Sequence, residues 1–162
     1  MANTLYDIAR QMMLTKQGAP TFTWDSVGQT ADDIYMIFVD GDYTPAFTGT
    51  GGVQYLNAIA TTSRHNSGAP EANNEGVQLQ VTSVTDDGAA DAEDTTMTAV
   101  LPFGTNNTGE IKAIVLYARK GADETQNPLI AYIDVATGLP IRPNGGDIIV
   151  SWDPGVNKIF RP

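Results

Sequence analysis

The chain has 162 residues, with 19 acidic against 9 basic side chains and a formal net charge of −10 at pH 7. A basic face is the usual footprint of nucleic-acid binding, so this balance excludes DNA and RNA as expected partners. The absence of cysteine excludes disulfides and thiolate metal sites. The length predicts a single domain, residues 1–162, that can bury its own core.

The sequence also lacks the usual signals for membranes and secretion. Its first residues do not form a basic stretch followed by an apolar run, so we expect no secretory signal. No segment approaches the roughly 20 apolar residues of a membrane span, and the negative charge disfavours an anionic membrane surface. We therefore expect a protein that is made in the cytoplasm and has no membrane partner.

The N-terminal segment, about 4–16, predicts a helix. Its apolar side chains recur at the spacing of one helical face: Leu5, Ile8, Ala9, Met12 and Met13. Asn3 or Thr4 can cap its start, and Asp7 suits the first turn. Such a helix either covers the core or latches onto a neighbouring subunit, and we favour the first because apolar stripes more often face a core.

The rest of the chain reads as short strands separated by Gly, Pro, Asn and Asp. The β-branched and aromatic runs lie at 33–39, 77–84, 95–101, 111–119, 129–134, 147–152 and 158–160. The segment 111–117 is almost uniformly apolar, which predicts a central strand covered on both faces. This pattern predicts a mainly β fold, an antiparallel β-sandwich or barrel-like domain with one N-terminal α-helix.

The connection 41–74 is a long, variable loop rich in Gly and Asn. Connections of this length in small domains are often functional. Within it, 55–59 could form a helical turn or a short strand, whereas Arg64 and His65 look like part of an exposed polar loop. We expect the connection to supply partner contacts, for which the candidate residues are Thr48, Gly49, Tyr55, Arg64 and His65.

Few residues suggest catalysis. His65 is the only histidine, and its polar surroundings in sequence show no orienting partner of the kind that acid–base work needs. A Ca²⁺ ion could use the acidic run of Asp86, Asp87, Asp91, Glu93 and Asp94, but its spacing does not fit the EF-hand pattern. We favour a solvated turn there, and we expect no enzyme activity, no metal and no cofactor.

The C-terminal third carries the most specific sequence motifs. The stretch 128–160 contains LIAYID, ATGLP, PNGGDI, a Trp-Asp pair and NKIF. It resembles the C-terminal signature of a family of small structural proteins of tailed bacteriophage virions. Residues 1–15, 34–44, 89–94 and 113–117 are similar to further segments of that family, in family order, whereas 49–74 departs from it.

This resemblance implies a virion structural protein that is assembled in the host cytoplasm. Within that family it favours a capsid decoration or cement protein, whose partners are the major capsid protein and further copies of itself, as a trimer or dimer. A tail or baseplate component is the alternative. A glycan-binding virion module is another, and it predicts an exposed platform of Tyr35, Tyr43, Tyr55 or Tyr132.

Overall fold

The computed structural model describes residues 3–14, 24, 33–49, 54–65, 75–80, 82–84, 89–105, 109–153, 155 and 158–160. Across these residues the fold is mainly β, with antiparallel sheets and one short N-terminal helix. This confirms the predicted fold class; of the two predicted architectures, the closed barrel does not occur in the described part. No helix in these ranges is long and apolar enough to cross a lipid bilayer.

The largest sheet forms the middle of the molecule. Its strands follow the order β1-β9-β8-β2-β3, and β4 also pairs with β2. All of these pairings are antiparallel. The strands are β1 (Thr4–Leu5), β2 (Asp33–Val39), β3 (Arg64–His65), β4 (Val77–Gln78), β8 (Ala113–Arg119) and β9 (Leu129–Ile133).

The central strand is β8, as its apolar sequence predicted. It lies between β2 and β9, and every side chain from Ala113 to Ala118 is buried. Because side chains alternate along a strand, Ile114 and Leu116 face one apolar cluster, whereas Val115 and Tyr117 face the other. One strand therefore contributes to two cores on opposite faces of the sheet.

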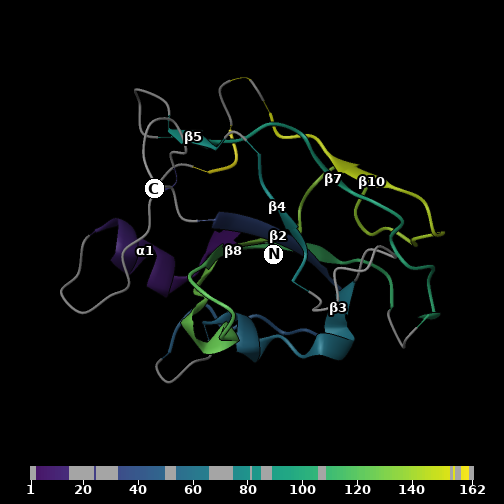
Figure 1. Cartoon of the computed structure of the whole chain (residues 1–162), viewed down its shortest axis with the longest axis horizontal. Helices are drawn as coiled ribbons and strands as arrows, with labels where there is room; N and C mark the ends of the chain where they lie inside the picture. Colours follow the sequence, from purple (N-terminus) through teal and green to yellow (C-terminus); the bar gives the residue numbers. More distant parts are fainter. Residues whose placement is uncertain are drawn as a thin grey trace.

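A layer of short strands covers the first face (Figure 1). It contains two two-stranded sheets, formed by β7 with β10 and by β5 with β6. The elements are β5 (Ser83–Val84), β6 (Ala90–Asp91), β7 (Thr95–Met97) and β10 (Ile148–Val150). Met97, Val100 and Trp152 from this layer are buried in the same cluster as Leu116.

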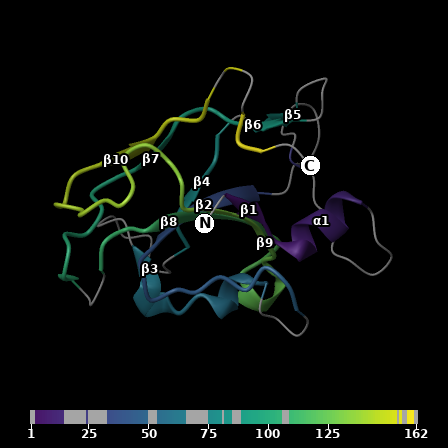
Figure 2. The ribbon, with the colours of Figure 1, turned by 180° about the vertical axis from the view of Figure 1, so that it is seen from behind.

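A layer of 3₁₀ turns covers the second face, on the opposite side of the sheet in both views (Figures 1 and 2). It comprises η1 (Leu56–Ala58), η2 (Thr61–Ser63) and η4 (Glu124–Gln126). Leu56 and Ile59 are almost completely buried there, in the cluster that contains Val115 and Tyr117. The helical turn allowed at 55–59 is therefore present as η1, and the rest of 54–65 is structured and partly buried where a variable loop was predicted. Residues 50–53 and 66–74 lie outside the described ranges.

The helix is shorter than predicted. It spans α1 (Asp7–Met13), because Thr4 and Leu5 instead pair with β9 as β1. The N-cap is Tyr6, with no side-chain cap, and Asn3 exchanges hydrogen bonds of 2.9 and 3.1 Å with the backbone of Val135. The predicted cap by Asn3 or Thr4 is therefore wrong, whereas Asp7 does lie in the first turn.

Of the seven predicted strands only 33–39 keeps its full length; 111–119 and 129–134 lose one or two end residues, and the other four are shortened or divided more strongly. The segment 77–84 divides into β4 and β5, because the chain leaves β2 after Leu79 and continues beside β6. The segment 95–101 stops at β7, since Ala99 turns the chain with a φ of 47°. Of 147–152 only β10 remains, and of 158–160 only a single bridge between Phe160 and Ala90.

Candidate functional site

The predicted contact residues at the start of the long connection lie at the surface. Thr48 and Gly49 are exposed, and the carbonyl of Gly49 accepts a hydrogen bond from the Gln54 side chain. Tyr55 is half-buried and forms a β-bridge with Pro128. Thr48 and Gly49 are therefore available to a partner, and Tyr55 only in part.

Arg64 was expected in an exposed loop, and this expectation is wrong. Its side chain is 1% exposed and forms a two-pronged ion pair with Glu124, in which Nη2 lies 2.8 Å from Oε2. The same guanidinium donates to the backbone carbonyls of Leu56 and Ile59. The hydrogen bonds that Arg64 donates to the Glu124 carboxylate hold its pKa below the usual range. A guanidinium suits this place because its fixed fork of donors matches a carboxylate and two carbonyls together.

His65 is also buried, which corrects the second half of that expectation. It pairs with Phe38 in the sheet, whereas Arg64 pairs with Val39, so the two neighbouring side chains point to opposite faces. Neither ring nitrogen has a hydrogen-bond partner in the part of the chain that the structure describes. Burial lowers the pKa of the imidazole, and the nearby Asp40 carboxylate opposes this effect only in part. A neutral, buried histidine cannot contact a macromolecular partner.

The outer surface of η1, η2 and the residues between them carries small, uncharged side chains. The exposed ones are Asn57, Ala58, Ala60, Thr61 and Thr62. The Arg64–Glu124 ion pair joins this part of the 3₁₀ layer to η4, in the turn between β8 and β9. The 3₁₀ layer is thus held in place by this ion pair, and η1 and η2 follow Thr48 and Gly49 in the same connection.

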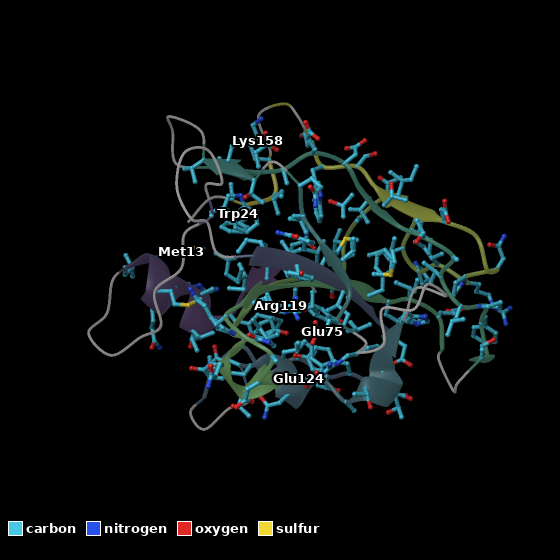
Figure 3. The ribbon with its side chains drawn as sticks, in the orientation of Figure 1. Met13, Trp24, Glu75, Arg119, Glu124 and Lys158 are labelled. Atoms are coloured by element: carbon cyan, nitrogen blue, oxygen red, sulfur yellow. The ribbon has the colours of Figure 1, made fainter. Side chains whose placement is uncertain are left out.

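Of the acidic candidate residues, Asp91, Glu93 and Asp94 lie within the described ranges. Asp86 and Asp87 lie outside the described residues. Asp91 forms a 2.7 Å ion pair with Lys158, which Figure 3 labels in the layer of short strands. Asp94 accepts hydrogen bonds from Ser151 and from the backbone of Trp152, and Glu93 is exposed. No three acidic or histidine side chains within the described ranges are grouped in a way that could hold a metal ion.

Three of these carboxylates, Asp91, Glu93 and Asp94, line a surface pocket of about 430 Å³. Ser151 and Trp152 line the same pocket. With Lys158 paired to Asp91, three negative charges face one positive charge here. The pocket therefore attracts cations, including the side chains of lysine and arginine.

A second, apolar groove of about 390 Å³ adjoins this acidic pocket at Ser151. Phe38 and Ile114 from the main sheet line it, together with Leu139 and Ile141 from the connection after β9 and with the strand β10. Sequence analysis missed this groove. The strand predicted at 147–152 gave no sign that Ile149 would be 63% exposed.

The tyrosines do not form the exposed platform that a glycan-binding module predicts. Tyr43 and Tyr132 are buried, and Tyr43 shares a 2.7 Å hydrogen bond with the hydroxyl of Tyr6. Burial raises the pKa of both hydroxyls in that pair. Tyr35 lies half-buried beneath the guanidinium of Arg119, and Arg119 also pairs with Glu75 at 2.9 Å (Figure 3).

Two surfaces of the described residues are candidates for binding: the outer face of the 3₁₀ layer with Thr48 and Gly49, and the apolar and acidic pockets around β10. Comparison with known proteins adds no relative: no family model, no curated protein and no solved structure matches this chain.

Proposed function

We propose that this protein is a structural component of a tailed-bacteriophage virion and that it decorates the assembled head. The observation that carries this proposal is the resemblance of segments spread over most of the sequence, above all 128–160, to a family of such proteins. In the fold, this C-terminal stretch supplies β9, the wall of the apolar groove, β10 and the buried Trp152. These are architectural and surface-building roles, which suit a binding protein.

A decoration protein acts by binding where neighbouring capsid subunits meet. Because it binds the assembled shell and not the separated subunits, each bound copy stabilises assembly by mass action. Closed symmetry favours a trimer or dimer at the local symmetry axes of the lattice. The net charge of −10 favours docking on a basic patch of the major capsid protein, so association should slow as salt is added.

The surface we assign to this contact is the exposed start of the connection after β2, with Thr48 and Gly49, together with the 3₁₀ layer. The Arg64–Glu124 ion pair and the buried Leu56 pre-order that layer. A surface that is already ordered loses less conformational entropy when it binds.

The first experiment separates heads from tails of purified virions and quantifies this protein in each fraction by mass spectrometry. Decoration predicts about one copy per one to three capsid subunits in the head fraction, as lattice symmetry requires. A few copies confined to the tail fraction would move the protein to the tail or baseplate. Absence from both fractions would refute the virion proposal.

The contact surface is tested by rebinding purified protein to heads that lack it. Thr48→Arg should weaken binding by about tenfold or more, because a bulky cation is placed in the contact facing a basic patch. Thr98→Arg is the matched control, since Thr98 is equally exposed but lies in the layer of short strands. Equal binding by both variants would place the contact elsewhere.

A further inference from the structure

The apolar groove beside β10 has an unusual border. Ile149 is 63% exposed although it lies in a strand that lines the groove. Exposed aliphatic side chains that border an apolar hollow mark interaction sites more often than isolated ones do. The groove is about 390 Å³, which is room for one or two aliphatic side chains and too little for a folded element.

One residue of β10 directs its backbone groups away from β7. Gly146 and Trp152, on either side of the strand, both direct backbone groups toward β7 and its neighbours: the Gly146 carbonyl accepts from Val100, and the Trp152 amide donates to Asp94. Because an antiparallel ladder alternates, the amide and carbonyl of Ile149 point away from β7. No described residue outside that ladder bonds to them.

The charge next to the groove is one-sided. Ser151, which follows β10, lines both the apolar groove and the acidic pocket, so the two hollows meet at this residue. Asp91 is paired with Lys158, but Glu93 is exposed, and the partners of Asp94 among the described residues are the neutral donors of Ser151 and Trp152. An occupant with an aliphatic side chain in the groove would gain from carrying a cation next to it.

We infer that β10 and its two pockets bind an extended peptide segment of a partner protein, with an aliphatic side chain in the groove and an adjacent lysine or arginine over Glu93 and Asp94. The peptide adds as a short strand at Ile149, whose free amide and carbonyl supply main-chain hydrogen bonds. Basic residues flanking the aliphatic anchor supply the charge complementarity that fixes the register. This inference does not depend on the virion proposal, because the partner is defined by its chemistry.

The probe is a pair of synthetic peptides of about nine residues, each with Val-Ile-Val next to Lys-Lys, placed before it in one peptide and after it in the other. Two controls replace Lys-Lys by Glu-Glu or Val-Ile-Val by Ser-Gly-Ser. Binding to the full chain is followed by two-dimensional NMR. We expect saturable shifts at the amides of Ile149 and Ser151 with one of the two Lys-containing peptides, and binding at least about tenfold weaker with either control.

The matched protein variants are Ile149→Lys and Leu14→Lys, both of which replace an exposed aliphatic side chain, 63% and 81% exposed, by a cation. Leu14 follows α1, at the other end of the main sheet from β10 (Figure 2). Ile149→Lys should abolish peptide binding, and Leu14→Lys should preserve it. Ile149→Ala is the milder variant, and its NMR spectrum checks that the fold is retained.

Three results would overturn the inference. The first is no saturable binding of either Lys-containing peptide at millimolar concentration. The second is binding that Ile149→Lys leaves unchanged. The third is a self-associating protein that Ile149→Lys converts to a monomer in sedimentation, which would make a second copy of the chain the occupant of this face.

Discussion

The two layers that cover the main sheet differ in a way that secondary structure alone would not suggest. The layer of 3₁₀ turns contains little regular structure, yet it is closed: Leu56 and Ile59 are almost fully buried and Arg64 bonds to two carbonyls and a carboxylate. The layer of short strands is more regular, yet it is open. It leaves a groove, an acidic pocket and the exposed Ile149.

This difference shows that regular hydrogen bonding and closure of a core are separate properties. A strand pair of three residues fixes the backbone direction but covers little area. The 3₁₀ layer instead contributes two almost fully buried aliphatic anchors, Leu56 and Ile59, and an ion pair whose guanidinium is buried. We therefore expect stability to depend on both layers and binding at β10 to depend on the open one.

The largest effect is expected from removing an anchor of the closed layer. Leu56→Ala leaves a cavity against Val115 and Tyr117 and should lower the free energy of unfolding by about 2–5 kcal/mol. Met97→Ala, at an equally buried site of the open layer, should cost a similar amount. Urea denaturation measures both. A loss below about 1 kcal/mol for Leu56→Ala would show that the 3₁₀ layer is only loosely attached.

The next effect is expected from the ion pair that pins this layer. Glu124→Gln leaves the Arg64 guanidinium buried without a counter-charge, and should cost about 2–3 kcal/mol. This is below the range for fully buried pairs because the Glu124 side chain is 29% exposed and partly screened by water. Replacing both residues, Arg64→Met with Glu124→Leu, should restore part of the loss.

The matched control is Glu110→Gln, which removes the carboxylate partner of Lys112 at the surface. The two carboxylates are similarly exposed, but Lys112 is 44% exposed whereas Arg64 is 1% exposed, so we expect a much smaller change than for Glu124→Gln in the same denaturation experiment. Equal effects of the two substitutions would mean that burial does not strengthen the Arg64–Glu124 pair.

A smaller effect should appear on acidification. Burial lowers the pKa of His65 in the folded chain, so the unfolded chain takes up the proton first, near its ordinary pKa of about 6.5. Stability is then complete above this pH and falls as the pH drops below it, by at most about 1.4 kcal/mol per pH unit. His65 is the only histidine, so the loss between pH 7.5 and 5.5 belongs to it. Urea denaturation of His65→Gln should show no such loss in that window.

The smallest effect is expected at the open edge. Ile149→Lys should change the free energy of unfolding by no more than about 0.5 kcal/mol, because most of the side chain is already in water. The same urea series measures it. A loss of several kcal/mol would indicate that Ile149 packs into the molecule and that β10 is not an open edge.

The sequence predicts the fold well where hydrophobicity is strong and continuous. The segment 33–39 coincides with β2, and the apolar run at 111–117 lies in and just before β8, the most covered strand. These runs are correct because a side chain in the centre of a sheet must be apolar whatever lies in the other layers. The shorter ends of 95–101 and 147–152 depend on which neighbour a strand finds, and this is not encoded locally.

The surface is predicted less well, for reasons that specific residues make clear. Arg64 and His65 are polar and lie beside Asn and Ser in sequence, so their burial depends on Glu124, sixty residues away, and on the pairing of β3 with β2. For Ile149 the local pattern misleads in the opposite direction, because an apolar residue of a strand is 63% exposed. In each case a long-range contact, made or missing, overrides the local pattern.

The strand β8 has a consequence for how the molecule moves. It is hydrogen-bonded on both sides and its alternate side chains belong to different cores, so neither core can separate from the other without breaking this strand. Its amides should exchange with deuterated water only in global unfolding events, while those of β10 exchange through local opening. Local opening at β10 would thus let the layer of short strands adjust to a ligand while the main sheet keeps its structure.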